Sequence, residues 1–366
     1  MSIGYSELPQ YPCMGDMWDS LKAQSRPIVI YGMGNGADKL IDRLSSIGVC
    51  PSGIFASDGF VRGQSFRGMT VRSLSDIKVE YPDPVILLSF GSRREDVLDL
   101  LTNIDKTEDL YIPDMPVAGV DEYFDREFYN AHYSEICRAY DALADDFSRR
   151  VFAKVIHFKL SGRLSYLEEA WSEVGEIYSL INKRRITTAL DLGAYNGDTL
   201  REMKEHIPTL RSAIALEPDP KTFRRLVKYA EAEDAISVKP ICAAAYSECS
   251  VGSFSSSGNR NSSIGATASY EHKCEEVSLV SADSLASSPD YIKYDVEGAE
   301  LEALIGSKET IIRHAPALLV SVYHRSRDIY SLILYLAEQH PGYKLYLRRQ
   351  RCVPAWELCV IALPEQ

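Results

Sequence analysis

Residues 189–219 constrain the fold of this chain more than any other stretch. They read as a buried strand (Ala189–Leu192), a glycine turn (Gly193–Gly197), a helix, and a second strand (Ala213–Leu216) that ends in the acid Glu217. An α/β fold holds an adenosine-containing cofactor with this combination of a strand, a glycine turn, a helix and a second strand that ends in an acid. The sequence therefore predicts an α/β fold organised around this unit.

The glycine turn differs from the turn that binds a dinucleotide. Its glycines follow the pattern G-x-x-x-G, and the acids Asp191 and Asp198 stand on either side of them. Two carboxylates repel a pyrophosphate but attract a cation. S-adenosylmethionine (SAM) carries a sulfonium and an ammonium, so we predict SAM as the cofactor of a methyltransferase.

Different residues of this unit are predicted to bind different parts of SAM. Gly193 and Gly197 let the backbone approach its amino-acid end, while Asp191 and Asp198 face its ammonium. Glu217 accepts both ribose hydroxyls, since a carboxylate takes two hydrogen bonds side by side. An alternative for the two aspartates is that they cap the helix and form the turn. The predicted cofactor-binding residues are Asp191, Gly193, Ala194, Tyr195, Asn196, Gly197, Asp198, Thr199, Glu217, Pro218, Asp219, Ala243 and Ala244.

A second informative segment, YIKYDVEGAE at residues 291–300, reads as a strand followed by a helix. The strand delivers Asp295 and Glu297 at its carboxyl end. The buried segment PALLVSVY ends in the same way at His324. Since ligands of such sheets bind at the carboxyl ends of the strands, we expect these side chains to share one edge with the glycine turn.

His324 is predicted to be the general base, because the unperturbed pKa of histidine lies near neutrality. Asp295 and Glu297 orient it, share its role, or hold a divalent cation that acidifies the acceptor hydroxyl. The alternative is that Glu297 caps the next helix while Lys293 pairs with a carboxylate. A divalent metal is possible but not favoured. The predicted catalytic residues are therefore His324, Asp295, Glu297 and Lys293, with no metal ligand among them.

Composition limits the class of partner. The 366 residues carry a net charge of −12, which argues against nucleic acid or an anionic membrane. No apolar run reaches the roughly 18 residues of a membrane helix, so no membrane insertion is expected. Eight scattered cysteines without a C-x-x-C pair indicate reduced thiols, a cytoplasmic location and no structural zinc. Whether the chain forms a homo-oligomer is left open.

The length suits two domains and a connector. We expect an N-terminal Rossmann-like α/β domain over 1–120, a helical connector of two or three helices over 121–184, and the methyltransferase domain over 185–366. The serine-rich stretch Ser250–Gly265 is predicted to line the site as a loop or to form an edge strand pair.

The first domain carries a glycine pattern of its own. Gly32, Gly34 and Ala37 fit G-x-G-x-x-A after a predicted strand, and Asp58 stands where a ribose-binding acid would be. Tight strand–helix packing explains such glycines equally well. No catalytic constellation accompanies the pattern, so we assign it no chemistry.

Four separated motifs carry a family resemblance. DLGAYNGDT, EPDP, YIKYDVEGAELEAL and SVYHRSRDIYSLILYL appear in this order and resemble the FkbM family of SAM-dependent methyltransferases from about residue 121 to the C-terminus. The resemblance implies a class I methyltransferase fold, Rossmann-like and mostly parallel with an antiparallel C-terminal strand. It also implies O-methylation of sugar or polyketide-type hydroxyls, and it places the segment 295–298 beside the reaction centre. The N-terminal unit is similar to Rossmann-like domains attached to enzymes of surface-polysaccharide synthesis, which favours a glycan acceptor.

The leading hypothesis is a SAM-dependent O-methyltransferase that acts on a hydroxyl of a carbohydrate or related small molecule in polysaccharide biosynthesis. A second hypothesis is a non-catalytic nucleotide- or sugar-binding protein with a vestigial methyltransferase domain. A third, an NAD-dependent oxidoreductase that uses the N-terminal glycines, lacks a catalytic Tyr-x-x-x-Lys near that domain.

Overall fold

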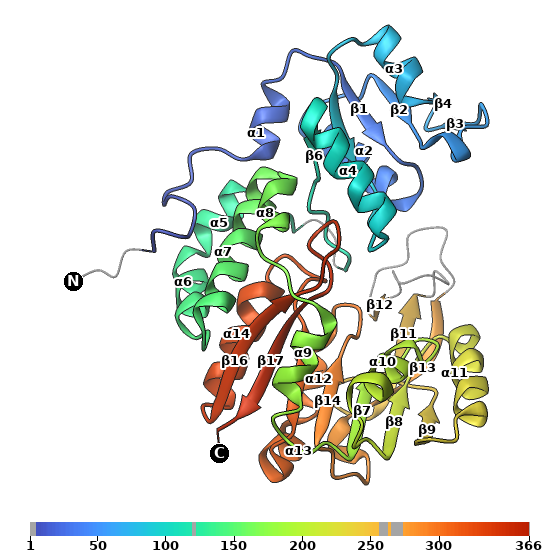
Figure 1. Ribbon diagram of the computed structural model, residues 1–366, viewed down its shortest axis with the longest axis vertical. Helices are drawn as coiled ribbons and strands as arrows, with labels where there is room; N and C mark the ends of the chain where they lie inside the picture. Colours follow the sequence, from blue (N-terminus) through green and yellow to red (C-terminus); the bar gives the residue numbers. More distant parts are fainter. Residues whose placement is uncertain (1–4, 119–121, 256–262, 265–273, 366) are drawn as a thin grey trace.

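A computed structural model describes residues 5–118, 122–255, 263–264 and 274–365. Two large sheets dominate the chain, one of six strands and one of seven. In Figure 1 the six-stranded sheet lies at the top, the seven-stranded sheet at the bottom, and a group of helices beside the junction. None of the described helices is long and apolar enough to cross a membrane.

The N-terminal sheet has the strand order β3-β4-β2-β1-β5-β6 and is parallel except for the hairpin of β3 and β4. Its central strands are short, β-branched and wholly buried, which is typical of a sheet covered on both faces. The strands are β1 (Ile28–Tyr31), β2 (Gly53–Phe55), β3 (Ser65–Phe66), β4 (Met69–Arg72), β5 (Val85–Leu88) and β6 (Asp109–Tyr111). The helices of this part are α1 (Met17–Lys22), α2 (Asn35–Ser46), α3 (Leu74–Glu80) and α4 (Glu95–Thr107), with a 3₁₀ turn at Asp58–Phe60.

Gly32 and Gly36 of the N-terminal turn have a packing role in this structure, whereas a Cβ added to Gly34 would meet no atom within 4 Å. A Cβ added to Gly32 would lie 2.6 Å from Cδ1 of Phe90, and one added to Gly36 would lie 2.0 Å from the carbonyl oxygen of Ser89. The turn after β1 therefore lies directly against the end of β5, where a side chain would not fit. Asp58 opens the 3₁₀ turn after β2.

The connector contains five helices among the described residues, so the expectation of two or three is wrong. The regular spacing of apolar residues suggests long continuous helices, but capping residues divide them. The side chain of Asp145 caps one helix at its start, and Gly162, at a φ of 65°, ends it. The helices are α5 (Arg126–Ala131), α6 (Tyr133–Asp141), α7 (Asp146–Ser161), α8 (Leu164–Glu168) and α9 (Val174–Ile181).

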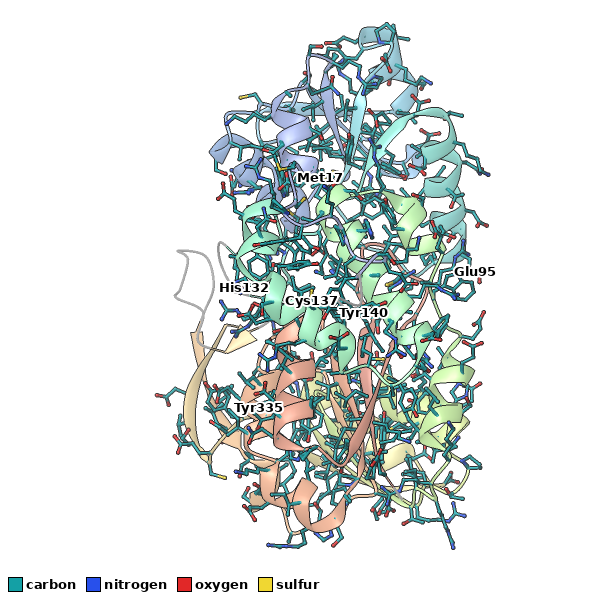
Figure 2. The ribbon with its side chains drawn as sticks, turned by 90° about the vertical axis from the view of Figure 1, so that its left-hand side faces the viewer. Met17, Glu95, His132, Cys137, Tyr140 and Tyr335 are labelled. Atoms are coloured by element: carbon teal, nitrogen blue, oxygen red, sulfur yellow. The ribbon has the colours of Figure 1, made fainter. Side chains whose placement is uncertain are left out.

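The connector helices pack on one end of the large sheet. Arg348 of that sheet makes an ion pair of 2.7 Å with Asp145. Figure 2 shows Cys137 and Tyr140 on α6 above Tyr335, which belongs to the helix α14 (Asp328–Gln339). One buried apolar cluster includes Val29 of β1 and Phe152 of α7 and extends into the large sheet. Where independently folding domains begin and end stays a prediction.

The large sheet has the order β16-β17-β15-β14-β7-β8-β9. Strand β17 is antiparallel to both of its neighbours, which confirms the expected antiparallel C-terminal strand, and the other neighbours pair in parallel. The strands are β7 (Thr188–Leu192), β8 (Ser212–Leu216), β9 (Ser237–Ile241), β14 (Tyr291–Tyr294), β15 (Ala317–Ser321), β16 (Tyr343–Arg349) and β17 (Leu358–Pro364). Besides α14, the helices around it are α10 (Asp198–His206), α11 (Pro220–Ala232), α12 (Glu300–Ile305) and α13 (Lys308–His314).

A small sheet of order β10-β13-β11-β12 follows β9 in the sequence. Its strands are β10 (Ala244–Ala245), β11 (Ser250–Ser255), β12 (Ser263–Ile264) and β13 (Cys274–Val280). Strands β11 and β12 pair antiparallel, which confirms the edge strand pair predicted for the serine-rich stretch. Residues 256–262 and 265 of that stretch lie outside the described residues.

Candidate active site

The pocket lies where the direction of the large sheet's connections reverses. From β7 the chain proceeds to β8 and β9 on one side, whereas β14 pairs with the other side of β7. Such a switch point opens a crevice at the carboxyl ends of the strands. The described residues that line the pocket include seven carboxylates and only two cations, Arg93 and Lys293, so the pocket favours a positively charged ligand.

Most predicted site residues line this pocket, and five do not. Those that line it are Gly193, Tyr195, Asp198, Thr199, Glu217, Pro218, Asp219, Ala243, Ala244, Lys293, Asp295 and Glu297. Those outside its lining are Asp191, Ala194, Asn196, Gly197 and His324.

The glycine turn bends sharply between β7 and α10. Gly193, Tyr195 and Gly197 have φ values of 98°, 46° and 86°, a backbone region that favours glycine. A Cβ on Gly193 would lie 1.9 Å from the carbonyl oxygen of Asp295, and one on Gly197 would lie 2.5 Å from Cδ1 of Tyr229. The glycines therefore let the turn lie against the end of β14 and against α11.

The two aspartates of the turn have different environments. Asp198 is the first residue of α10, and Gly197 occupies the cap position. Oδ1 of Asp198 accepts a hydrogen bond of 3.0 Å from the backbone N–H of Thr199, so Asp198 satisfies a donor of the first turn without being the cap residue. Asp191 is fully buried in β7, and neither of its carboxylate oxygens has a hydrogen-bond partner among the described residues. Burial raises the pKa of Asp191 to about 7, although Lys293, 3.9 Å away, opposes this.

Glu217 lies at the end of β8 on the far side of the turn. Its side chain is 7 % exposed, and Oε1 accepts a hydrogen bond of 2.8 Å from the backbone N–H of Asp219. Burial raises the pKa of Glu217 to about 7, and this backbone donor opposes the rise. Asp219 itself caps α11, since its carboxylate accepts from the backbone of Lys221 and Thr222.

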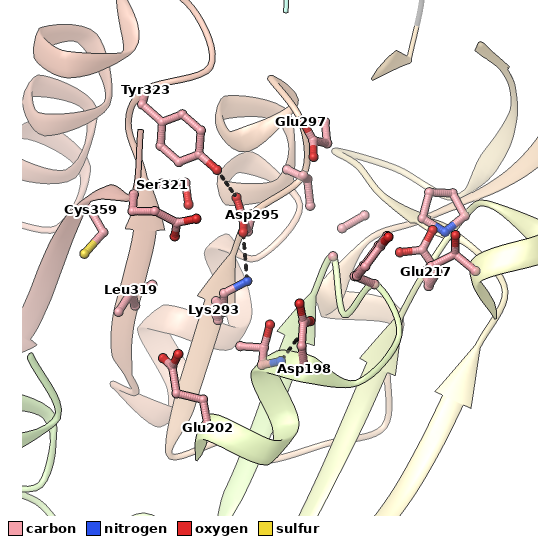
Figure 3. Close-up of a pocket in the computed structure, with 18 of the residues that line it drawn as sticks. Asp198, Glu202, Glu217, Lys293, Asp295, Glu297, Leu319, Ser321, Tyr323 and Cys359 are labelled. Carbon is pink, nitrogen blue, oxygen red and sulfur yellow. Dashed lines mark hydrogen bonds and ion pairs between the residues drawn. The ribbon is translucent and has the colours of Figure 1, made fainter. Parts of the chain in front are cut away.

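The end of β14 forms the other wall of the pocket. Nζ of Lys293 lies 3.1 Å from Oδ2 of Asp295, and the hydroxyl of Tyr323 donates to Oδ1 of Asp295 over 3.3 Å. Figure 3 shows these three side chains in a row, with Glu217 across the pocket. Burial opposes ionisation of Asp295, but Lys293 and His324 outweigh it and lower the pKa of Asp295 to about 2. The pairing of Lys293 with a carboxylate is thus confirmed.

His324 lies behind this wall. It is fully buried, its Nε2 lies 3.6 Å from Oδ1 of Asp295 and 3.4 Å from Oε2 of Glu297, and its Nδ1 lies 2.9 Å from Oε1 of Glu300. Burial opposes its charge, but Glu300 first, then Glu297 and Asp295, outweigh burial and raise the pKa of His324 to about 10. An imidazole that neither lines the pocket nor loses its proton near neutrality does not suit the role of general base that the sequence suggested.

Glu300 and several lining residues escaped the sequence analysis. Glu300 begins α12 and accepts backbone hydrogen bonds from Val296 and Gly298 of 2.9 and 3.3 Å, so the alternative that Glu297 supports this turn applies to Glu300 instead. The sequence signal that could have identified Glu300 was its position three residues after Glu297. The other missed lining residues come from distant segments and include Arg93, Tyr178, Glu202, Ser321, Tyr323, Gln350 and Glu357.

The fold and the site together define a class of protein. A seven-stranded sheet in this order, with one antiparallel strand and an acid-lined pocket at its switch point, is the class I methyltransferase fold. Residues 191–345 match the family described as "Methyltransferase FkbM domain". The chain therefore carries an FkbM methyltransferase domain over those residues, and it is a methyltransferase.

A solved structure extends the likeness of the fold beyond that domain. The methyltransferase FkbM from Methylobacillus flagellatus KT is 20% identical, with a TM-score of 0.69 over 93% of this chain and 90% of its own. An rRNA methylase from Streptococcus thermophilus is 7% identical, with a TM-score of 0.35 over 52% and 95%. Fibrillarin from Aeropyrum pernix, in complex with natively bound S-adenosyl-L-methionine, is 16% identical, with a TM-score of 0.33 over 52% and 73%. No curated protein matches the chain.

Proposed function

We propose that this chain is a SAM-dependent O-methyltransferase that acts on a hydroxyl of a carbohydrate or related small molecule. One observation carries the proposal: the acid-flanked glycine turn and the row formed by Lys293, Asp295 and Tyr323 face the same pocket. The first suits the donor and the second suits a hydroxyl acceptor.

The residues on the donor side fit SAM. Glu217 offers a buried carboxylate for the two ribose hydroxyls, and its Oε1 already accepts a backbone hydrogen bond. Asp191 has two buried oxygens without hydrogen-bond partners among the described residues, and buried carboxylates without partners are costly unless a ligand compensates them. Its carboxylate acts on the ammonium of SAM directly or through water. The acidic lining further favours a sulfonium over a phosphate.

The acceptor side provides groups that bind and deprotonate a hydroxyl. When bound, SAM supplies a methyl group on a positively charged sulfur, and transfer breaks the carbon–sulfur bond as the acceptor oxygen bonds to the same carbon. Glu297, which reaches the pocket, accepts the proton of that hydroxyl. Asp295, whose pKa is lowered to about 2, remains ionised and accepts a hydrogen bond from the hydroxyl. Tyr323 and Lys293 hold Asp295 in place. His324 positions Asp295 and Glu297 from behind.

A carbohydrate acceptor is supported by the character of the lining. Gln350, Glu357 and Ser321 add an amide, a carboxylate and a hydroxyl to the pocket wall, and such groups hydrogen-bond the hydroxyls of a sugar. We propose a small-molecule or glycan acceptor, a place in polysaccharide biosynthesis and a cytoplasmic location, with no nucleic-acid partner.

The proposal is tested by binding and by transfer. We expect SAM and S-adenosylhomocysteine to bind and to raise the melting temperature, and labelled SAM to methylate a member of a panel of nucleotide-sugars and oligosaccharides. Glu217→Ala should abolish binding by removing the ribose contact. Glu231→Ala, which changes an exposed acid on α11, should leave binding unchanged. Failure of both nucleosides to bind the wild-type protein would reject the proposal.

A further inference from the structure

Three carboxylates converge on the buried imidazole of His324. Asp295 and Glu297 approach its Nε2, and Glu300 approaches its Nδ1. His324 and Glu300 are 0 and 1 % exposed, whereas the side chains of Asp295 and Glu297 are 27 and 29 % exposed and reach the pocket. The cluster thus connects a buried histidine with the place where the acceptor hydroxyl would lie.

The distances around Nε2 suit a metal ion. Nε2 lies 3.6 Å from Oδ1 of Asp295 and 3.4 Å from Oε2 of Glu297. Metal bonds to histidine and carboxylate are about 2.0–2.2 Å long, so neighbouring ligand atoms on one ion stand roughly 3–3.5 Å apart. Ligand atoms of Asp295, Glu300 and His324 also lie within 4.8 Å of one another. Nε2 is therefore spaced from each of the two carboxylates as two ligands of one cation would be.

The other side of the imidazole ring faces a carboxylate, the kind of group that lies behind metal-binding histidines. Nδ1 of His324 lies 2.9 Å from Oε1 of Glu300, and Glu300 is in turn held by the backbone N–H groups of Val296 and Gly298. A carboxylate behind a histidine fixes the ring and directs the other nitrogen toward a metal.

The unsatisfied atoms of the cluster are an independent observation. Both ring nitrogens of His324 and Oε2 of Glu300 are buried and have no hydrogen-bond partner among the described residues. An unsatisfied buried polar atom costs about 1–3 kcal/mol, so a ligand at Nε2 would remove such a cost. The nearby cation Lys293 is directed at Oδ2 of Asp295, whereas the Oδ1 that faces the imidazole accepts a hydrogen bond of 3.3 Å from the hydroxyl of Tyr323.

We propose that His324 Nε2, Asp295 and Glu297 bind a divalent transition-metal cation, with Glu300 orienting the imidazole. One nitrogen and two carboxylate ligands suit Mn²⁺, Fe²⁺, Co²⁺ or Zn²⁺ better than Ca²⁺. In the metal-free protein, the protonated imidazole of His324 balances the charge of these carboxylates. The role rests on the proposed function, with the cation taking over the deprotonation assigned there to a carboxylate. When bound, the cation would lower the pKa of a coordinated acceptor hydroxyl, whose proton would pass to solvent as the oxygen takes the methyl group.

The test measures metal binding without any methyl donor. Full-length protein is stripped with a chelator, dialysed and titrated with Mn²⁺, while the free ion is followed by electron paramagnetic resonance. We expect one Mn²⁺ per chain. His324→Gln should weaken binding at least tenfold, because it removes the nitrogen ligand. Glu300→Gln should weaken it roughly 10- to 100-fold, as loss of an orienting carboxylate does.

His340 provides a matched control. It is also buried, its Nε2 also lacks a hydrogen-bond partner among the described residues, and its ring packs against Tyr335 and Tyr343 instead of carboxylates. His340→Gln should leave Mn²⁺ affinity within twofold of wild type. An equal loss in both histidine variants, or no stoichiometric binding by the wild-type protein, would overturn the proposal.

Binding of S-adenosylhomocysteine, measured separately, distinguishes the two proposals. It should persist in His324→Gln, which would also show that this variant is folded. If His324→Gln does not fold, Glu297→Gln, which changes a part-exposed ligand, must show the tenfold loss of Mn²⁺ affinity on its own. Mn²⁺ binding without nucleoside binding would reject the methyltransferase proposal and leave the metal site standing, and the reverse result would do the opposite.

Discussion

Gly193 and Asp295 are in close backbone contact: a Cβ on Gly193 would lie 1.9 Å from the carbonyl oxygen of Asp295. The two residues belong to the glycine turn and to the end of β14, which are about a hundred residues apart in the chain. Their contact brings the donor side and the acceptor side of the pocket together. The absence of a side chain at Gly193 is therefore a condition for the geometry of the whole site.

Gly193→Ala should damage both the fold and the site. The added Cβ meets the Asp295 carbonyl, and alanine is strained at a φ of 98°. We expect a loss of about 1–3 kcal/mol in the free energy of unfolding, measured by urea denaturation, and at least a tenfold loss in affinity for S-adenosylhomocysteine, measured by calorimetry.

Gly175→Ala is the control for this change. Gly175 lies exposed in α9, with no atom within 4 Å of an added Cβ. Alanine is the better helix former, so this variant should gain about 0.5–1 kcal/mol. A wild-type stability and affinity in Gly193→Ala would contradict the tight contact.

Binding of S-adenosylhomocysteine should strengthen as pH rises through about 7. The pKa of Glu217 is raised to about 7 by burial, and only the ionised carboxylate accepts two ribose hydroxyls. Affinity at about pH 6 should therefore be roughly tenfold lower than at about pH 8. Glu217→Gln should reduce this slope, and the part that remains belongs to Asp191, whose pKa is also about 7. An unchanged slope in Glu217→Gln would remove Glu217 from the ribose site.

The stability of the ligand-free protein should depend on pH in the opposite sense. The folded state raises the pKa of Glu217 from 4.5 to about 7. Between these two pH values, Glu217 of the folded protein therefore retains a proton that the unfolded chain has lost. Stability from this group is complete below 4.5 and is lost as pH rises through about 7. The loss should reach up to about 3 kcal/mol, measured by urea denaturation across this range. Glu217→Gln should lose less over the same range, whereas Glu231→Gln should follow the wild type.

The sequence placed the right segments at one edge of the sheet but not the direction of each side chain. Asp191, Glu217 and Asp295 do stand at neighbouring strand ends. Successive residues of an extended chain point to opposite sides, and after β15 this makes Tyr323 a lining residue and turns His324 away from the pocket. The sequence identified His324 as a candidate. Its role depends on which side of the extended chain its side chain points to, and the hydrophobic pattern does not determine this.

Residues that enter the pocket from elsewhere had no sequence signal. Arg93 comes from the N-terminal part, Tyr178 from α9 and Glu357 from the segment before β17. Their approach depends on how the connector packs on the large sheet. The number of connector helices was missed for a related reason, since single capping residues such as Asp145 and Gly162 interrupt a regular apolar spacing.

Lys293→Met should destabilise the protein strongly. Lys293 is the cation between two carboxylates, 3.1 Å from Asp295 and 3.9 Å from Asp191. Removing one partner of a buried ion pair costs about 3–5 kcal/mol, because the remaining charge is buried without compensation. Lys344→Met removes an exposed lysine that lies 3.7 Å from Glu365 and should change the free energy of unfolding by less than about 1 kcal/mol. Similar unfolding midpoints for the two variants would show that Lys293 is not essential to the charge balance.

Arg93 connects the N-terminal part of the chain with the acceptor side of the pocket. Its guanidinium lies 3.1 Å from Oε1 of Glu357, and both residues line the pocket. The neighbouring Ser92 exchanges two backbone hydrogen bonds with Val353, of 2.7 and 3.0 Å. This docking holds Arg93 at the pocket wall that carries Glu357, which the proposed function assigns to the acceptor.

Arg93→Ala should therefore affect the acceptor and spare the donor. We expect affinity for S-adenosylhomocysteine to stay within twofold and kcat/KM for the acceptor to fall at least tenfold. Stability should change by less than about 1 kcal/mol, because the side chains of Arg93 and Glu357 are 45 and 22 % exposed and ion pairs that solvent reaches contribute little. Arg94→Ala, which removes the next arginine and its exposed pairing with Asp96, should leave both parameters unchanged. Equal kinetic losses in the two variants would assign the effect to general charge and not to the position of Arg93.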